Sequence, residues 1–204
     1  MTTSASTLIG RVTRCSLRGF VGALRLPEPD MPTFGAFCTA EAQQGTSHVV
    51  GLIYDITIQD DEFARQIATT EGVSEEQIAD QQQNRQIPIE VSALAVGYRR
   101  GNRYQQALPP QPPLSLAPIY SLPSAEVVAF TQDLAFLPLV LSAGNLPVDE
   151  LLAAALQQAA LARPQAERRP FLLEAGRVCS RLMADDLGRL DTLLQGLRPV
   201  ESGA

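Results

Sequence analysis

The alternation of apolar and polar side chains changes along the chain, and its first third favours short β-strands. Strand-like runs lie at residues 8–14, 19–26, 35–40 and 48–58, separated by turns rich in glycine, proline or polar residues. The last of these runs holds many β-branched and aromatic residues, which are typical of strands. Its Gly51 predicts a bulge or bend of the kind that curls a small sheet into a barrel.

Residues 60–83 interrupt this pattern, because they are acidic, rich in glutamine and poor in large apolar side chains. Such a composition predicts a helical insertion that lies on the barrel surface between two strands. Strand character returns at 86–98, where Pro88 predicts an edge position for the start of the strand, and residues 99–107 form a hairpin tip and the return. About six short strands favour a small Greek-key barrel over an open sheet.

Residues 107–123 contain six prolines in seventeen positions. Proline fixes φ and disfavours helix in the preceding residue, so residues 108–118 are expected to be extended. Four apolar side chains of this segment are available to pack against the barrel: Leu114, Leu116, Ile119 and Tyr120. This favours an ordered connector, although PxxP matches at 109–113 keep a peptide-ligand motif as the alternative.

Beyond Pro123 the apolar positions repeat at helical spacing. The pattern predicts a helix at 125–136 capped by Ser124, and a second that follows Pro147 and runs to Arg163. A third helical segment opens near Pro170 and carries apolar residues every three or four positions, with a candidate break at 185–186. Such a stripe is typical of a core or a subunit interface.

The predicted fold class is therefore α+β, a small closed or partly open antiparallel β-barrel followed by an all-α module. The predicted boundaries are a barrel at 1–106 with its helical insertion at about 60–83, a proline-rich connector at 107–123, and a helical domain at 124–204. A chain of 204 residues with 45% hydrophobic residues can bury the cores of two such units. No apolar run long enough to cross a membrane and no signal-peptide pattern occurs, so we expect a cytoplasmic protein without membrane contact.

The residue inventory removes several kinds of active site. All sixteen basic residues are arginine, which excludes a P-loop lysine, a Schiff-base lysine and a lysine general base. The single histidine, His48, opens an apolar strand, and we interpret it as a strand histidine at a sheet edge or surface. Cys15, Cys38 and Cys179 lack metal-binding spacing and are expected to be buried structural cysteines. We therefore assign no catalytic, cofactor-binding or metal-binding residue, and expect no cofactor.

The net charge of −6 disfavours a protein that binds duplex nucleic acid. Arginines at 11, 14, 18 and 25 and at 99–103 keep nucleic-acid binding through a barrel face as a further alternative.

Three stretches resemble the HAS barrel, the small β-barrel of the HerA-type DNA translocases and of the ATP-synthase α and β subunits. They are residues 9–12 (IGRV), 32–38 (PTFGAFC) and 50–53 (VGLI), and residues 112–120 (PPLSLAPIY) are similar to the segment that leaves the barrel in the HerA group. The resemblance covers about residues 8–123 and implies a non-catalytic collar through which ring subunits contact each other and their partners. In that family an ATPase follows the barrel, whereas this chain has no GxxxxGK[ST] motif and continues with helices.

The favoured hypothesis is a non-enzymatic assembly or adaptor protein that binds a protein partner or itself, in the setting of a DNA-processing or ATPase machine. The candidate interaction surface combines hairpin arginines with helical leucines: Arg99, Arg100, Arg103, Leu187, Leu190, Leu194 and Leu197. The alternative is a metal-dependent or nucleotide-linked catalytic module in nucleic-acid metabolism, with Asp60, Asp61, Asp185 and Asp186 as candidate carboxylates. Paired acids at a helix start more often serve as caps and dipole partners.

Overall fold

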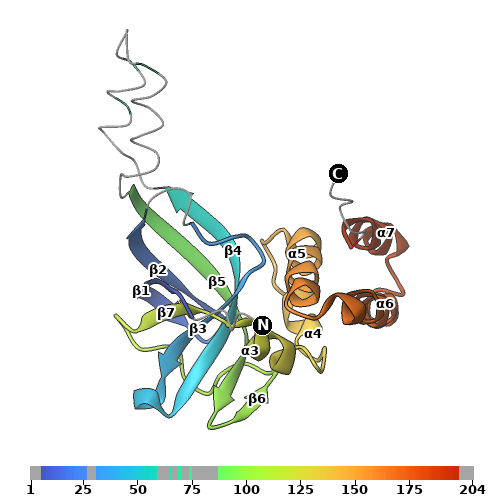
Figure 1. Ribbon diagram of the computed structural model, residues 1–204, viewed down its shortest axis with the longest axis horizontal. Helices are drawn as coiled ribbons and strands as arrows, with labels where there is room; N and C mark the ends of the chain where they lie inside the picture. Colours follow the sequence, from blue (N-terminus) through green and yellow to red (C-terminus); the bar gives the residue numbers. More distant parts are fainter. Residues whose placement is uncertain are drawn as a thin grey trace.

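A closed antiparallel β-barrel forms the amino-terminal part of the computed structural model, which describes residues 6–26, 31–58, 65, 69, 74 and 87–197 (Figure 1). The described residues form seven strands: β1 (Leu8–Ser16), β2 (Gly19–Leu26), β3 (Phe37–Ala42), β4 (Ser47–Ile58), β5 (Ile87–Arg100), β6 (Arg103–Gln105) and β7 (Pro118–Ser121). Their order is β2-β1-β7-β3-β4-β5-β6, and pairing of β2 with β5 closes six strands into the barrel while β6 lies outside it. The predicted α+β class with a small antiparallel barrel is confirmed, and the barrel is closed.

Alternating side chains of these strands fill the barrel interior. The inner core contains Ile9, Val12, Phe20, Cys38, Val49, Ile53, Ile89, Val91, Ala93 and Ile119. Neighbouring positions on β3, β4 and β5 point outward, among them Phe37, Leu52 and Val96, and these are buried as well. One wall of the barrel is therefore apolar on both faces, which requires a second layer to cover its outer side.

The bulge predicted at Gly51 is confirmed. The register between β4 and β5 shifts between Val50 and Gly51, and again between Ile53 and Asp55. A Cβ atom at Gly51 would lie 3.0 Å from two ring atoms of Phe20, so glycine here lets the β4 backbone approach this aromatic ring across the interior.

Strand β7 was missed by the sequence pattern. It lies between β1 and β3, pairing Ile119 with Gly10 and with Ala40, and so it supplies a barrel strand from within the segment predicted as a connector. The edge position predicted for the start of β5 agrees with the pairing among the described residues, because Ile87 and Pro88 pair only with β2, whereas β5 from Ile89 onward lies between β2 and β4. Pro88 pairs with Arg25 of β2 and stands one residue before the pairing with β4 begins.

The proline-rich segment ahead of β7 is ordered against the barrel. Its backbone amides at Leu114 and Leu116 donate to the carbonyls of Glu41 and Val12, and Pro113 forms a bridge with Ala42. Of the four side chains expected to pack down, Ile119 is buried, while Leu114, Leu116 and Tyr120 are exposed. The hydrogen bonds of the backbone, more than leucine packing, hold this segment in place.

The described residues after the barrel form five helices: α3 (Ser124–Phe130), α4 (Leu137–Leu141), α5 (Val148–Leu161), α6 (Gln165–Leu182) and α7 (Leu187–Gly196). The helix predicted from Pro147 is confirmed as α5, and the break at 185–186 separates α6 from α7. Helix α6 begins five residues before Pro170, which lies inside its first turns on the exposed side. Among the described residues no helix is long and apolar enough to cross a membrane.

The helix predicted over 125–136 is wrong in its second half, because α3 ends at Phe130. The Gln106 side chain explains the end of α3. Its amide nitrogen donates to the carbonyls of Phe130 and of Asp133, the latter at 2.8 Å, and its amide oxygen accepts from the Phe136 amide at 2.7 Å. One glutamine directly after β6 thus fixes the turn that separates α3 from α4.

Helices α3, α4 and α5 cover the apolar outer wall of the barrel, and α6 and α7 lie on the far side of α5 (Figure 1). The centre of this contact is an aromatic cluster of Phe37, Phe130 and Phe136, whose ring centroids are 5.5 to 6.1 Å apart. These edge and tilted geometries are favourable for aromatic pairs. A single core therefore runs from the barrel wall into the helical layer.

Candidate functional site

The exposed apolar side chains of α6 and α7 form the first candidate site. Leu187 and Leu194 are two helical turns apart on one face of α7, and they are 72% and 36% exposed. Leu194 lies 3.4 Å from the position that a Cβ would take at Gly176 of α6. Leu173, one turn before Gly176, is 57% exposed. We call Leu173, Leu187 and Leu194 the leucine surface.

The remaining leucines of α7, and Leu197 directly after its end, belong to the core. Leu193 and Leu197 are buried and Leu190 packs against the same cluster. Leu197, which the sequence placed in the candidate interaction surface, is therefore a core residue, and Leu190 is only partly exposed. Helical spacing in the sequence identified the apolar side of α7, but it did not distinguish the buried leucines from the exposed ones. It also gave no reason to select Leu173 of α6.

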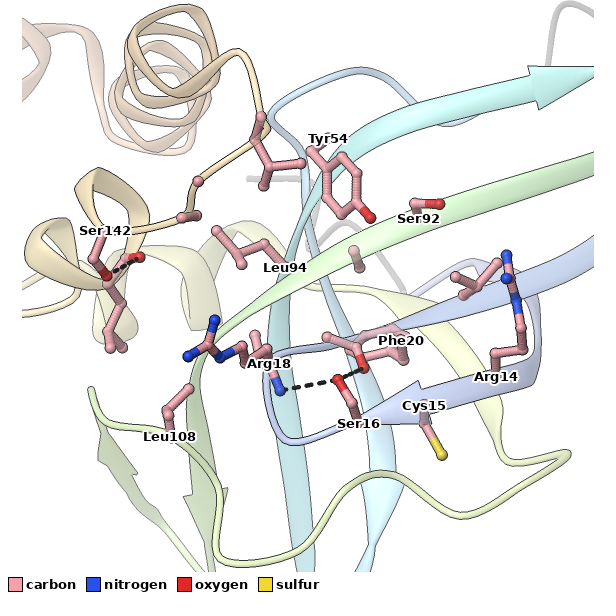
Figure 2. Close-up of a pocket in the computed structure, with 18 residues that line it drawn as sticks. Arg14, Cys15, Ser16, Arg18, Phe20, Tyr54, Ser92, Leu94, Leu108 and Ser142 are labelled. Carbon is pink, nitrogen blue, oxygen red and sulfur yellow. Dashed lines mark hydrogen bonds between the residues drawn. The ribbon is translucent and has the colours of Figure 1, made fainter.

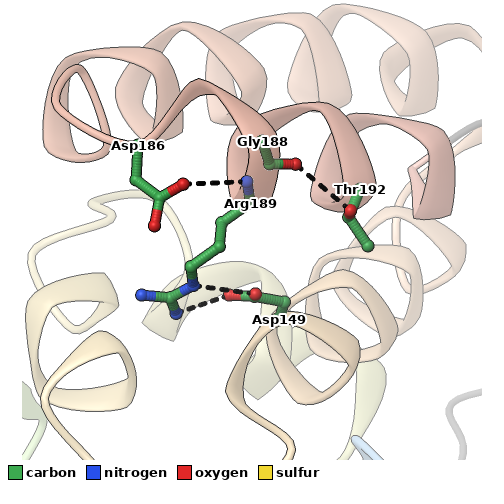
Figure 3. A network of polar contacts seen from close by, with 5 residues as sticks. All are labelled: Asp149, Asp186, Gly188, Arg189 and Thr192. Atoms are coloured by element: carbon green, nitrogen blue, oxygen red, sulfur yellow. Dashed lines mark hydrogen bonds and ion pairs between the residues drawn. The ribbon is translucent and has the colours of Figure 1, made fainter.

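A polar network holds α7 against α5 beside this surface (Figure 3). The Arg189 guanidinium makes two hydrogen bonds to the Asp149 carboxylate, at 2.9 and 2.7 Å. These bonds raise the pKa of Arg189. The Asp186 carboxylate accepts from the Arg189 amide at 3.1 Å and so caps the start of α7. The bidentate Arg189–Asp149 pair connects the start of α7 with the start of α5.

The candidate carboxylates have different positions. Asp186 acts as the helix cap just described, and Asp185 is exposed next to it. Asp60 and Asp61 lie outside the described residues, as does most of the predicted helical insertion at 60–83. Within the part of the chain that the structure describes, no group of three or more His, Cys, Asp or Glu side chains could hold a metal ion.

The three arginines of the candidate surface gather on the β5–β6 hairpin, but two of them have partners. Arg99 bonds to the Glu126 carboxylate of α3 at 3.0 Å, and the Arg100 guanidinium donates to the Gln43 side chain. Arg103 is exposed. Arg99 therefore connects the barrel with α3.

The same Glu126 carboxylate accepts a 2.6 Å hydrogen bond from the Tyr104 hydroxyl. Burial, together with this hydrogen bond to the carboxylate, raises the pKa of Tyr104. His48 lies nearby on β4, opposite Glu41 and Arg99, and is half-buried. It is a strand histidine, as expected, although β4 is not an edge strand. Burial and the Arg99 charge lower its pKa, so the imidazole is neutral at pH 7.

The cysteines differ from the expectation at one position. Cys38 and Cys179 are buried as predicted, and burial raises their thiol pKa values to about 12 and about 11. Cys15 is exposed near the end of β1, where it pairs with Phe20 of β2 and its sulfur is 3.2 Å from the Pro113 carbonyl oxygen.

The barrel arginines considered for nucleic-acid binding do not act as a set. Arg11 donates to the Leu116 carbonyl oxygen at 3.0 Å, and Arg14 pairs with Glu90 at 3.1 Å. The side chain of Arg25 lies outside the described part of the chain. The Arg18 guanidinium has no hydrogen-bond or ion-pair partner among the described residues.

A scan against models of known protein families found no match, and a search of curated proteins found no similar sequence.

Proposed function

We propose that this protein is a non-enzymatic assembly or adaptor protein that binds a protein partner, or a second copy of itself, through the leucine surface. The observation that carries the proposal is the exposure of Leu173, Leu187 and Leu194 on two helices that are otherwise anchored to the core. Apolar side chains gathered on an otherwise polar surface are typical of interaction sites.

The mode of anchoring supports this role. Leu193 of α7 and Leu197 directly after it are buried in the core, and the Arg189–Asp149 ion pair connects the start of α7 to α5. A rigid helix pair loses little conformational entropy on binding, so the leucines can contribute most of their burial to affinity.

The resemblance to the HAS barrel supports the same class of function, since the role of that barrel is non-catalytic contact between subunits. It also extends the proposal to a DNA-processing or ATPase machine as the setting of the partner. The buried thiols and the neutral His48 supply no activated nucleophile among the described residues.

The test compares the wild type with the double variant Leu173→Asp, Leu187→Asp. Leu116→Asp is the matched control, because Leu116 is 66% exposed on the barrel and has a φ of 63°, which aspartate tolerates. The measurements are light scattering after size exclusion, and cross-linked pull-down from extract of the native cell.

We expect self-association or capture of one specific partner by the wild type and the control, and its loss in the double variant. A monomeric wild type that captures no partner would refute the proposal. Equal capture by the wild type and the double variant would refute the assignment of the surface.

A further inference from the structure

A groove of about 600 Å³ lies on the outer face of the barrel, on the side where the β1–β2 hairpin approaches α4 (Figure 2). Its floor is formed by β5, mainly Leu94 and Ser92, with Tyr54 from the adjacent β4. Its walls are the hairpin, Leu108, and the end of α4 with the loop that follows.

The charge of this groove differs from that of the chain. Two arginines line it, Arg14 and Arg18, and no Asp or Glu side chain is among the described residues that do so, whereas the whole chain carries a net charge of −6. Arg14 is paired with Glu90 at the edge of the groove. Arg18 is the arginine left available, and Figure 2 shows its guanidinium pointing into the space bordered by Leu94, Leu108 and Ser142.

Arg18 extends from a hairpin tip with a fixed backbone. The Arg18 amide donates to the Ser16 hydroxyl at 3.1 Å, and its carbonyl accepts from the Ala95 amide of β5 at 2.9 Å. Gly19 permits this close packing, because a Cβ there would lie 2.4 Å from the Ala93 carbonyl oxygen. The Arg18 backbone is therefore fixed at one end of the groove, while its guanidinium forms no ion pair with a carboxylate of the described residues.

Two hydroxyl groups in the groove also lack described partners. Ser92 is 9% exposed, and neither its hydroxyl nor that of half-buried Tyr54 makes a hydrogen bond within the described ranges. Buried polar groups are nearly always hydrogen-bonded, so these two are available to a ligand or to water. The remaining lining is mostly apolar, with leucines at 94, 108, 139 and 146.

We propose that this groove binds the carboxylate of an amphipathic ligand, with the carboxylate on Arg18 and an apolar body on Leu94 and the Tyr54 ring. A guanidinium matches a carboxylate in a bidentate geometry. A single available cation with an apolar lining suits one negative charge better than a phosphate dianion, which proteins usually hold with several donors. The carboxyl end of a peptide and a fatty acid share this chemistry. The inference does not depend on the leucine surface.

The probes are N-acetyl-Ala-Leu-Leu as the free acid, the same tripeptide as its carboxamide, and octanoate. Binding is measured by isothermal titration calorimetry and by ¹H–¹⁵N NMR shifts of the Ser92 and Leu94 amides and of the Arg18 Nε–H. We expect a free acid to bind to the wild type. Arg18→Gln should weaken the affinity for this acid at least about tenfold, because a charge-assisted hydrogen bond is lost. Tyr54→Phe keeps the ring and removes the hydroxyl, and it is expected to weaken the affinity for the tripeptide acid by about threefold.

Arg103→Gln is the matched control, because Arg103 is exposed on another hairpin and does not line the groove. Stronger binding of the tripeptide acid identifies a peptide end as the source, and stronger binding of octanoate identifies a lipid acid. Equal binding of acid and amide, unchanged binding by Arg18→Gln, or no shift with any probe at millimolar concentration would overturn the inference. Failure of partner capture by the leucine surface would leave these outcomes unaffected.

Discussion

Arg163 is the most informative position for a stability test, because it is buried and no carboxylate of the described residues lies at ion-pair distance from it. It is 7% exposed, and its guanidinium donates to the carbonyl of Ala159 at 2.7 Å and to that of Thr131 at 2.9 Å. The guanidinium carbon lies 3.7 Å from the centre of the Phe171 ring. Burial lowers the pKa of Arg163, because the guanidinium loses part of its hydration at this site.

The two carbonyls explain why this cost is tolerated. Thr131 caps the end of α3, and Ala159 lies in the last turn of α5, where the Arg163 amide bonds to Ala160 instead. The guanidinium therefore caps the negative ends of two helices, a placement that the helix dipole favours. Its contact with Phe171 connects both ends to α6.

Arg163→Met keeps the length of the side chain and removes these interactions. Loss of hydrogen bonds leaves two carbonyls with an unsatisfied cost of about 1–3 kcal/mol each, and loss of the cation–π contact adds about 1 kcal/mol. Recovery of the guanidinium solvation offsets part of this sum. We expect a net decrease of about 2–4 kcal/mol in the free energy of unfolding.

Urea unfolding followed by circular dichroism measures this decrease, and a chain of this size should lose about 2–4 °C of Tm per kcal/mol. Arg177→Met is the control, because Arg177 is 70% exposed and pairs with Glu174 on the same helix. We expect the control to lose less than about 0.5 kcal/mol. An Arg163→Met protein as stable as the control would refute the capping argument.

Three further predictions test the fold. Gly35→Ala should lower the free energy of unfolding in urea by more than about 2 kcal/mol, because φ is +77° and the new Cβ would lie 2.5 Å from the Ala154 Cβ. Gly101→Ala is the control: φ is +59° but the surrounding space is open, so it should lower the same free energy by about 1 kcal/mol. The folded-state pKa of His48 lies below its unfolded value of 6.5, so the unfolded chain binds more protons in this range. The free energy of unfolding should therefore fall as the pH drops from about 6.5 towards 5, and it should fall less steeply in His48→Gln. Equal slopes in the wild type and His48→Gln would contradict this. Iodoacetamide at pH 8 should alkylate Cys15 in the native protein and the two buried thiols only in denaturant, as counted by mass spectrometry; labelling of all three in the native state would contradict their burial.

The sequence predicts best the features that local patterns determine. The bulge at Gly51 follows from a glycine inside a strongly β-forming run, and the break between α6 and α7 follows from a pair of aspartates in a helical repeat. Most strand ranges were predicted to within a few residues for the same reason.

The missed features depend on contacts between distant segments. Strand β7 has four residues and no alternation of its own, and it is extended because β1 and β3 lie on both sides of it. The early end of α3 depends on Gln106, a polar residue whose role appears only when the barrel meets the helices. The exposure of Cys15 likewise depends on its place near the end of β1, beside the Pro113 carbonyl of a distant segment.

The candidate sites follow the same division. The sequence indicated an apolar α7 but could not assign Leu187 and Leu194 outside and Leu197 inside, because that assignment requires the position of α5. It also grouped four barrel arginines, of which Arg11 and Arg14 have internal partners.

The position of β7 has a consequence for folding during synthesis. Strand β1 pairs with β7 at Leu8 and Tyr120, so the gap between β1 and β3 stays open until more than half of the chain has left the ribosome. Before that point both strands present unpaired backbone edges, which are prone to pair with other chains. A fragment ending at residue 106 should therefore aggregate, whereas one extended past Ser121 gains the strand that closes the barrel.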